Sequence, residues 1–150
     1  MTEETNSKCG EFAAAVRRHG GQTHHLDNDG ALLMIVDDEP QVVAINKSLL
    51  VARDYRLITF DHPASAFEAY CEIGELVDAV LLDYAMPGMN GHELFQRLKA
   101  SNPELKAVLI SGYADHRSID EMFDEGLRAF LAKPYTPEQL YEKVAETLAH

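Results

Sequence analysis

Residues 77–91 read VDAVLLDYAMPGMNG, a short apolar run that ends in an aspartate and leads into a turn containing Pro and Gly. Similar apolar runs recur along the chain, and they are nearly continuous rather than alternating between apolar and polar residues. Such runs are typical of strands that are covered on both faces of a sheet. The five runs are residues 31–36, 55–60, 77–82, 106–110 and 128–131.

Segments with the apolar spacing of amphipathic helices separate these runs. One begins at Pro40, another follows Asn90-Gly91, and the last begins at Pro137 after Thr136, a favourable residue for capping a helix. Strands that alternate with helices favour a parallel sheet with right-handed crossovers. The sequence therefore predicts one α/β domain over residues 31–150, with five strands and five helices.

Residues 1–30 differ from this pattern and predict an N-terminal extension. The segment 20–30 is rich in Gly, His, Asn, Thr and Asp, a composition that favours a flexible linker. One short helix is predicted near residues 11–18, where Phe12, Ala15 and Val16 fall on one side.

The composition excludes several classes of protein. The chain has 150 residues and a net charge of −12, and an acidic surface disfavours direct binding of nucleic acid. No apolar run approaches the ~20 residues that cross a bilayer, and the acidic start lacks the features of a secretion signal. The two cysteines, Cys9 and Cys71, form neither a disulfide framework nor a zinc pattern. We expect a cytoplasmic protein without membrane association.

Polar residues follow the predicted strands at the point where each one ends. Asp37, Asp38 and Glu39 follow the first run, Asp83 the third, Ser111 the fourth, and Lys133 closely follows the fifth. Because ligands of open α/β sheets bind beyond the carboxyl ends of the strands, these groups predict a site. Crowded carboxylates repel unless a cation neutralises them, and oxygen ligands suit Mg²⁺. A carboxylate there can act as a nucleophile toward a phosphoryl group, whose oxygens the ammonium and hydroxyl can contact.

Four pieces of sequence resemble the receiver domain of bacterial response regulators. They are IVDDEP (35–40), LLDYAMPGMNG (81–91), ISGY (110–113) and FLAKPY (130–135), and the resemblance runs from about residue 31 to 148. It implies a flavodoxin-like (βα)5 fold, which is a doubly wound parallel five-stranded sheet with strand order 2-1-3-4-5.

The resemblance also implies the role of each site residue. Asp83 is the expected phosphoacceptor, Lys133 pairs with the phosphoryl group, and Ser111 and Phe130 are the switch residues. For Mg²⁺, the family pattern makes Asp38 an expected direct ligand besides Asp83, with Asp37 expected to act through water. The backbone carbonyl of Ala85 completes the metal ligands, and the bond Lys133–Pro134 is expected to be cis.

The partners follow from the same resemblance. The phosphoryl group is expected to come from a phosphohistidine of a sensor histidine kinase or histidine phosphotransfer protein. The domain is not expected to be an enzyme beyond its own phosphotransfer and slow autodephosphorylation. Output is expected through a downstream protein partner or a homodimer, on the face made by the helix before residues 128–131, that strand and the C-terminal helix.

The C-terminus and three positions that vary within the receiver family give two further expectations. Because the chain ends at His150, we expect either a stand-alone receiver or the receiver portion of a larger hybrid histidine kinase. Gly112 is small enough to admit small phosphodonors, whereas Ala85 and Tyr113 lack the acid or amide that orients an attacking water. The phosphorylated state is therefore expected to last longer than in family members with polar groups at these positions.

Other functions compete with this interpretation. A haloacid dehalogenase-type hydrolase usually has a second Asp two residues after the nucleophile, where this chain has Ala85. A flavin- or nucleotide-binding module needs a phosphate-cradling turn after the first strand, whereas the acidic residues there repel phosphate. A pseudo-receiver usually lacks a key residue that this chain retains. Asp38 or Glu39 can equally be a helix cap, and Tyr84, Met86 and Met89 serve either loop packing or kinase recognition.

Overall fold

The computed structural model describes residues 3–112 and 116–149. Helices and strands alternate along almost all of this length, as the sequence predicts. The helices are α1 (Glu3–Arg18), α2 (Pro40–Val51), α3 (Pro63–Ile73), α4 (Gly91–Ser101), α5 (His116–Asp124) and α6 (Pro137–Ala149), with a short 3-10 helix at Gly74–Leu76. The strands are β1 (Gln22–His24), β2 (Leu32–Val36), β3 (Arg56–Phe60), β4 (Ala79–Asp83), β5 (Ala107–Ser111) and β6 (Ala129–Ala132).

The described strands form one sheet in the order β1-β3-β2-β4-β5-β6. Strands β2 to β6 are all parallel to their neighbours, and their order is the predicted 2-1-3-4-5. The sheet is larger than predicted, because β1 adds a sixth strand antiparallel to β3. The α/β class and the flavodoxin-like fold are therefore confirmed, with one additional edge strand.

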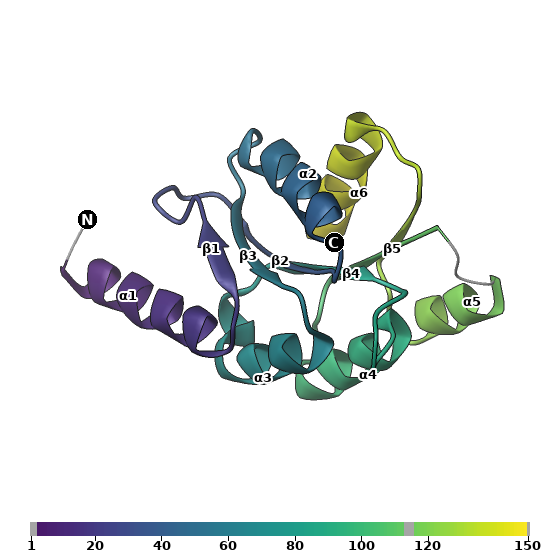
Figure 1. The fold of residues 1–150 in the computed structure, drawn as a ribbon, viewed down its shortest axis with the longest axis horizontal. Coiled ribbons are helices and arrows are strands. Elements are labelled where there is room, and N and C mark those ends of the chain that lie inside the picture. The colour runs from purple at the N-terminus through teal and green to yellow at the C-terminus, as the bar shows by residue number, and fades with distance from the viewer. Residues whose placement is uncertain (1–2, 113–115, 150) are drawn as a thin grey trace.

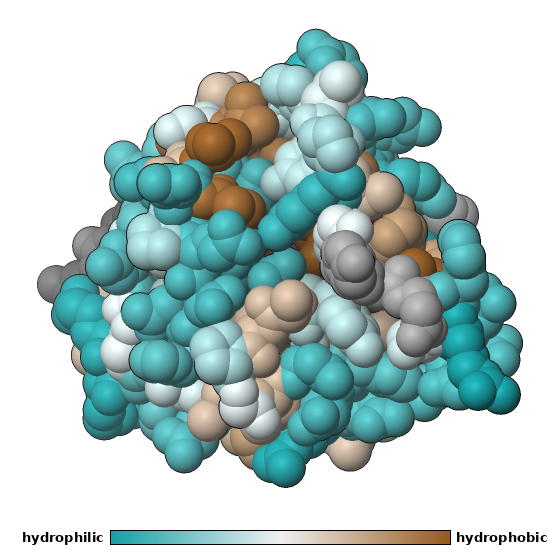
Figure 2. Space-filling model, turned by 45° about the vertical axis from the view of Figure 1, so that its right-hand side comes forward, coloured by the Kyte–Doolittle hydropathy of each residue, from teal (hydrophilic) through white to brown (hydrophobic). Residues whose placement is uncertain are grey.

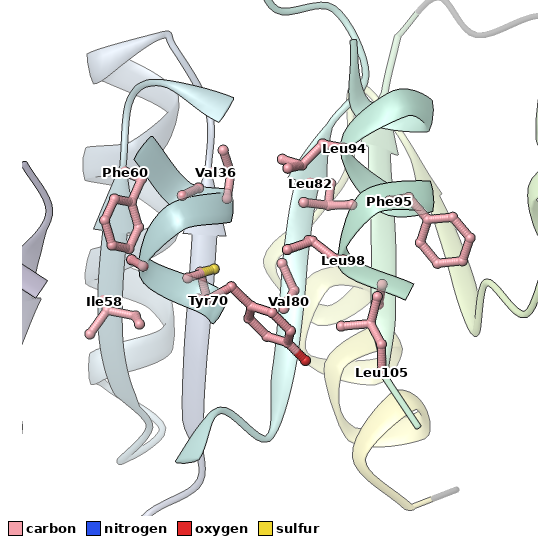
Figure 3. Close-up of a cluster of buried hydrophobic side chains, with 14 of the residues drawn as sticks. Val36, Ile58, Phe60, Tyr70, Val80, Leu82, Leu94, Phe95, Leu98 and Leu105 are labelled. Atoms are coloured by element: carbon pink, nitrogen blue, oxygen red, sulfur yellow. The ribbon is translucent and has the colours of Figure 1, made fainter. Parts of the chain in front are cut away.

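Helices cover both faces of the sheet (Figure 1). Helices α2 and α6 pack on one face, over a cluster that includes Leu33, Ile35, Leu81 and Leu131. Helices α1, α3, α4 and α5 contribute to the cluster on the other face, part of which Figure 3 shows, with Tyr70 beside Val80 and Leu94 beside Leu82. Because alternate residues of each strand enter opposite clusters, the strands are apolar at nearly every position.

Local side-chain contacts fix two helix starts beside the carboxyl edge of the sheet. Asn90 Oδ1 accepts a hydrogen bond from the backbone N–H of Glu93 at the start of α4. At the start of α6, Thr136 Oγ1 accepts from the N–H of Gln139, whose Oε1 accepts in turn from the N–H of Thr136. Such reciprocal bonds satisfy backbone donors that the first helical turn leaves free. The predicted cap at Thr136 is confirmed.

The N-terminal extension is ordered where it was predicted to be a linker. Residues Gln22–His24 form β1 on the edge of β3, so the linker interpretation of residues 20–30 is wrong for this part. Helix α1 also begins earlier than the predicted short helix. The sequence did not show this because a three-residue strand of polar composition carries no apolar pattern, and only its pairing with β3 makes it a strand.

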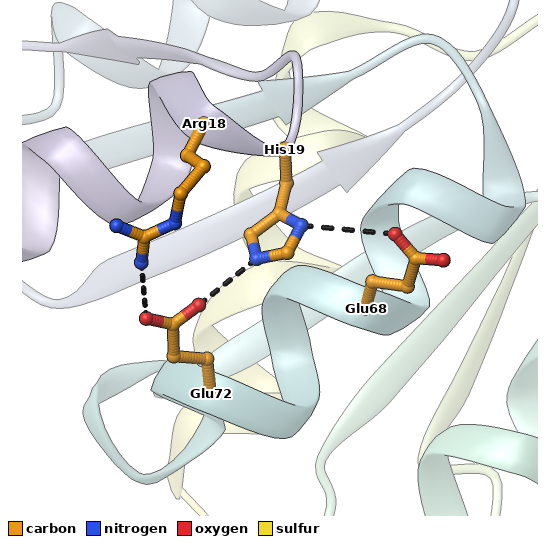
Figure 4. Close-up of polar contacts among 4 residues, drawn as sticks. All are labelled: Arg18, His19, Glu68 and Glu72. Atoms are coloured by element: carbon orange, nitrogen blue, oxygen red, sulfur yellow. Dashed lines mark hydrogen bonds and ion pairs between the residues drawn. The ribbon is translucent and has the colours of Figure 1, made fainter.

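The extension is attached by apolar packing and by polar contacts. Val16 is fully buried and joins the α3–α4 side of the core. Gly21 lies so close to Phe60 that a Cβ there would be 2.6 Å from the ring. At the surface, Arg18 and His19 both contact Glu72 of α3, with His19 Nε2 2.9 Å from Glu72 Oε2 (Figure 4). Exposed ion pairs contribute little, so the buried contacts dominate the attachment.

Hydrophilic residues cover most of the face that Figure 2 shows, with hydrophobic residues gathered in a few small groups. The large apolar residues that are exposed in the described chain are Ile45, Leu76 and Phe123. Across residues 3–112 and 116–149, no helix is both long enough and apolar enough to cross a membrane.

Substitution Val16→Asp is expected to detach the extension, because an unpaired carboxylate at a fully buried position is strongly unfavourable. Hydrogen exchange of the amides of β1 should become fast, while the amides of β2 and β4 keep their protection. The matched control is Ala14→Asp on the exposed side of the same helix. Unchanged protection of β1 in Val16→Asp, or equal loss in both variants, contradicts this account.

Candidate functional site

The predicted polar residues converge at the carboxyl edge of the sheet. Asp83 ends β4, Ser111 ends β5, and Lys133 directly follows β6. Lys133 Nζ lies 3.2 Å from Asp83 Oδ1, and Asp83 is only 5% exposed. The backbone N–H of Lys133 donates to the carbonyl of Ser111 at 3.0 Å. The predicted cis bond Lys133–Pro134 is confirmed.

The acidic group has a different membership from the one predicted. Asp37, Glu39 and Asp83 each place one carboxylate oxygen within 4.8 Å of the others. Asp38, the predicted direct metal ligand, is not in this group, although its Oδ1 is buried without a hydrogen-bond partner among the described residues. Glu39 was predicted to lie in the acidic run after the first strand but was not predicted as a metal ligand, and its alternative interpretation was a helix cap. Its side chain makes no capping hydrogen bond among the described residues. The sequence feature that indicates Glu39 is the run of three consecutive acidic residues, Asp37-Asp38-Glu39.

Burial makes the ionised form of Asp37 costly and raises its pKa to about 6. The N–H of Glu39, which donates to Asp37 Oδ1 at 2.9 Å, lowers the pKa, whereas the negative charge of Asp83 raises it further. The Lys133 ammonium lowers the pKa and Glu39 raises it. Asp37 therefore gains a proton more readily in the folded chain than an exposed aspartate.

Burial also raises the pKa of Asp83, and the ammonium of Lys133 opposes that effect. For Lys133 itself, burial lowers the pKa, but the carboxylates of Asp83 and Asp37 outweigh it and the pKa is raised. Lys133 is thus charged at neutral pH. One ammonium stands against several carboxylates, so the site has a negative surplus that favours a further cation.

Two buried carboxylate oxygens lack a hydrogen-bond donor among the described residues, Asp38 Oδ1 and Asp83 Oδ2. A buried oxygen without a donor is costly, and a bound cation is one way to satisfy it. Oxygen donors of this kind are the ligands that Mg²⁺ prefers. The residues present therefore fit a divalent cation.

In the loop after β4, the backbone of Gly91 lies very close to the backbone of Asp83. The N–H of Gly91 donates to the carbonyl of Tyr84 at 2.7 Å and closes the loop. A Cβ on Gly91 would lie 2.5 Å from the carbonyl oxygen of Asp83, so only glycine fits there without movement. Sequence reasoning placed Gly91 at a helix start but missed this contact, which depends on how α4 meets β4.

The other loop residues divide between packing and exposure. Met86 is buried in the core, and Tyr84 and Met89 pack against the same cluster, which favours the packing interpretation of these residues. Ala85 and Gly112 are exposed. Tyr113 lies outside the described residues.

Ser111 and Phe130 belong to the same face of the sheet. Phe130 is partly buried and packs against the cluster on the α3–α4 side, which also contains Leu109. Ser111 lies two positions after Leu109 on β5 and therefore shares its face. Ser111 is buried, and β5 and β6 are paired through Leu109 and Phe130. The two predicted switch residues are thus on adjacent strands and on one side.

The N-terminal extension borders the site. A cavity of about 320 Å³ is lined by residues of β1, the end of β3, helix α2 and the loop residue Asp37. His24 of β1 faces Thr59 with its Nε2 3.3 Å from Oγ1, and burial lowers the pKa of this imidazole. Residues that were predicted to form a linker therefore lie beside the acidic group.

The family pattern of the response regulator receiver domain matches residues 33–145. The chain belongs to this family. Receiver domains are the phosphoacceptor domains of two-component signal transduction, and they pair with sensor histidine kinases and downstream effectors. This membership decides against the hydrolase and the flavin-binding alternatives.

Two curated relatives show how the receiver domain is used elsewhere. The chain is 31% identical over 118 residues to the sensor kinase CckA of Brucella abortus. The aligned region covers 79% of this chain and 12% of the relative. It is 31% identical over 123 residues to the cyclic di-GMP phosphodiesterase response regulator RpfG of Xanthomonas campestris, covering 79% of this chain and 32% of the relative. The chain thus spans a minor part of both proteins.

Solved structures agree in fold. A receiver domain protein from Clostridium thermocellum superimposes with a TM-score of 0.76 at 22% identity, covering 79% of this chain and 94% of the other. The CheX–CheY–BeF3–Mg²⁺ complex from Borrelia burgdorferi matches with a TM-score of 0.73 at 21% identity, covering 76% and 86% of the two chains.

The raised pKa of Asp37 gives a pH dependence in the absence of divalent metal. Between the ordinary pKa of 3.8 and the folded value of about 6, the folded chain binds more protons than the unfolded chain. The contribution of Asp37 to the free energy of unfolding should therefore fall as pH rises from about 4 to about 6. Substitution Asp37→Asn should remove this fall and stabilise the domain at pH 7.5 by roughly 2 kcal/mol, measured by denaturant unfolding with chelator.

The matched control for this experiment is Asp61→Asn, an exposed aspartate directly after β3 at the same edge. It should leave the free energy of unfolding nearly unchanged across this pH range. If Asp37→Asn retains the wild-type slope, or is destabilised at pH 7.5, burial does not control the protonation of Asp37.

Substitution Gly91→Ala tests the close approach behind Asp83. The added methyl group collides with the Asp83 carbonyl, so the free energy of unfolding should drop by about 1–3 kcal/mol in thermal or denaturant unfolding. Gly112→Ala is the control, because its Cβ would meet Lys133 at an ordinary 3.5 Å. Equal stability of the two variants would show that α4 tolerates the shift.

Proposed function

We propose that Asp83 accepts a phosphoryl group from a phosphohistidine of a sensor histidine kinase or a histidine phosphotransfer protein. The observation that carries this proposal is the contact at Asp83, a buried carboxylate with Lys133 Nζ 3.2 Å from Oδ1 and no hydrogen-bond donor on Oδ2 among the described residues. Such a carboxylate has one oxygen beside a phosphate-pairing cation and one left for a metal.

The transfer requires little beyond placement and charge compensation. One oxygen of Asp83 forms a bond to phosphorus as the bond from phosphorus to the donor's imidazole nitrogen breaks, and the electron pair stays on that nitrogen. The Lys133 ammonium pairs with a phosphoryl oxygen and the Ser111 hydroxyl donates to another. The products are an aspartyl phosphate and a free histidine.

Asp37, Glu39 and Asp83 are the carboxylates best placed to hold Mg²⁺, with Asp38 and the carbonyl of Ala85 as further candidates. When bound, the ion neutralises charge on the phosphoryl oxygens. The negative surplus of the site supports this assignment, since Lys133 is the cation that contacts Asp83. Removal of divalent metal should therefore prevent phosphorylation.

The switch is proposed to run from Ser111 to Phe130. Attraction of the Ser111 hydroxyl to the phosphoryl group vacates space on the face that the two residues share, and Phe130 turns into it. The surface formed by α5, β6 and α6 then changes and alters the affinity for a downstream partner or a second copy. Phe123 of α5, which is 43% exposed, offers an apolar contact on this surface.

The chain is proposed to act as a signalling domain that catalyses only its own phosphorylation and slow dephosphorylation. The phosphodiesterase in the name of RpfG belongs to that protein, of which this chain matches 32%. The relatives support either a response regulator or a hybrid kinase as the context of this receiver domain.

The deciding experiment compares wild type with Asp83→Asn. Wild type should gain one phosphoryl group from acetyl phosphate with Mg²⁺, measured by intact mass, and should bind beryllium fluoride with Mg²⁺, measured by thermal shift. Asp83→Asn should do neither, because an amide is not a nucleophile toward phosphorus. Chelation of Mg²⁺ should abolish both responses of wild type.

Asp61→Asn again serves as the control, since this exposed aspartate follows a strand at the same edge without joining the acidic group. It should behave as wild type. If Asp83→Asn is phosphorylated like wild type, the acceptor is another residue. If wild type gives no response to either reagent, the chain is a pseudo-receiver.

A further inference from the structure

A hydrogen bond away from the acidic group links two elements that carry site residues. Tyr135 Oη donates to Asn46 Oδ1 at 2.6 Å. Tyr135 lies two residues after Lys133, in the loop between β6 and α6. Asn46 lies in α2, the helix that begins directly after the acidic run. The bond therefore connects the loop that holds the site ammonium to the helix that follows the site carboxylates.

Packing alone does not account for Asn46. It is 1% exposed and, with Leu50, is one of the two buried residues of α2. The neighbouring cluster between the sheet and the helices α2 and α6 is apolar, and a buried amide there costs desolvation that an apolar side chain avoids. Tyr135, which packs against the same cluster, supplies the donor that the amide oxygen needs. Burial raises the pKa of Tyr135, so its hydroxyl keeps its proton.

The loop that carries Lys133 is thus attached on two sides. On one side, the N–H of Lys133 donates to the carbonyl of Ser111 at the end of β5. On the other side, the ring hydroxyl of Tyr135 reaches α2. Between these attachments, the long and partly exposed lysine side chain ends 3.2 Å from Asp83. A flexible four-carbon side chain keeps a fixed end point best when its backbone is fixed.

We propose that Tyr135 and Asn46 are positioning residues for phosphoryl transfer, whose hydrogen bond holds the Lys133 ammonium at the phosphoryl position beside Asp83. This inference rests on the proposed function of the site. The proposed role of Tyr135 and Asn46 predicts weaker binding of a phosphoryl group with unchanged binding of Mg²⁺. Loss of the bond weakens contacts that Lys133 makes to a phosphoryl group, whereas the carboxylates that are candidates for holding Mg²⁺ keep their places.

The test uses the full chain with substitutions Tyr135→Phe and Asn46→Ala, singly and together. Each single variant should bind beryllium fluoride about 5- to 10-fold more weakly than wild type at saturating Mg²⁺, and should be phosphorylated by acetyl phosphate more slowly by a similar factor. Because both act through one bond, the double variant should be no worse than either single variant. The dissociation constant of Mg²⁺ alone, from calorimetric titration, should stay within about two-fold of wild type.

Tyr55→Phe is the matched control, since it removes a hydroxyl from a partly buried tyrosine at the same apolar cluster, far along the chain from Lys133. It should bind beryllium fluoride as wild type does. If Asn46→Ala fails to fold, Tyr135→Phe alone decides the proposal, because it retains the ring.

Wild-type binding of beryllium fluoride and its loss in Asp83→Asn separate this proposal from the function of the site. Given both, wild-type affinity and rate in Tyr135→Phe would overturn the positioning role. Equal weakening of Mg²⁺ and beryllium fluoride binding would overturn it too, because it would show a general loosening of the domain. Additive losses in the double variant would show that the two residues do not act through their bond.

Discussion

Asp37, Glu39 and Asp83 each hold a carboxylate oxygen within 4.8 Å of the others, and their mutual repulsion is the constraint around which the site is built. The repulsion is not relieved by distance, because the parallel strands deliver these residues to one edge of the sheet. The ammonium of Lys133 relieves it in part. Burial, with a smaller contribution from the charge of Asp83, also raises the pKa of Asp37, so this carboxyl group takes up a proton more readily than an exposed one. The negative charge of such a site favours a bound cation. A phosphoryl group, which is also negative, is repelled unless that cation and the lysine neutralise its charge.

The rest of the domain keeps that costly arrangement in place. Strands that are buried on both faces cannot shift without breaking two apolar clusters. Gly91 allows α4 to begin against the carbonyl of Asp83, and the N–H of Lys133 ties its loop to β5. Both contacts are made by the backbone, so they use neither the Lys133 ammonium nor the Asp83 carboxylate, which pair with each other.

The N-terminal extension adds a feature that the receiver family pattern does not include, since that pattern begins at residue 33. Strand β1 covers the edge of β3, and an uncovered edge of this kind presents unpaired backbone groups to other chains. Helix α1 packs beside α3 through Val16 and through the contacts of Arg18 and His19 with Glu72. The extension also lines the cavity beside Asp37.

The sequence by itself determined the fold class and four of the residues that meet at the carboxyl ends of the strands, Asp37, Asp83, Ser111 and Lys133, whereas the order of the parallel strands was implied by the resemblance to receiver domains. It did so because short apolar runs identify buried strands, and the strand ends of a parallel sheet share one edge. Only the tertiary structure decided that Glu39 rather than Asp38 joins the acidic group, that residues 22–24 form a strand, and that Tyr135 reaches Asn46. These outcomes depend on the direction of a side chain in a turn, on an edge that becomes available only after the sheet forms, and on the approach of residues 89 positions apart. None of these three leaves a periodic pattern in the sequence.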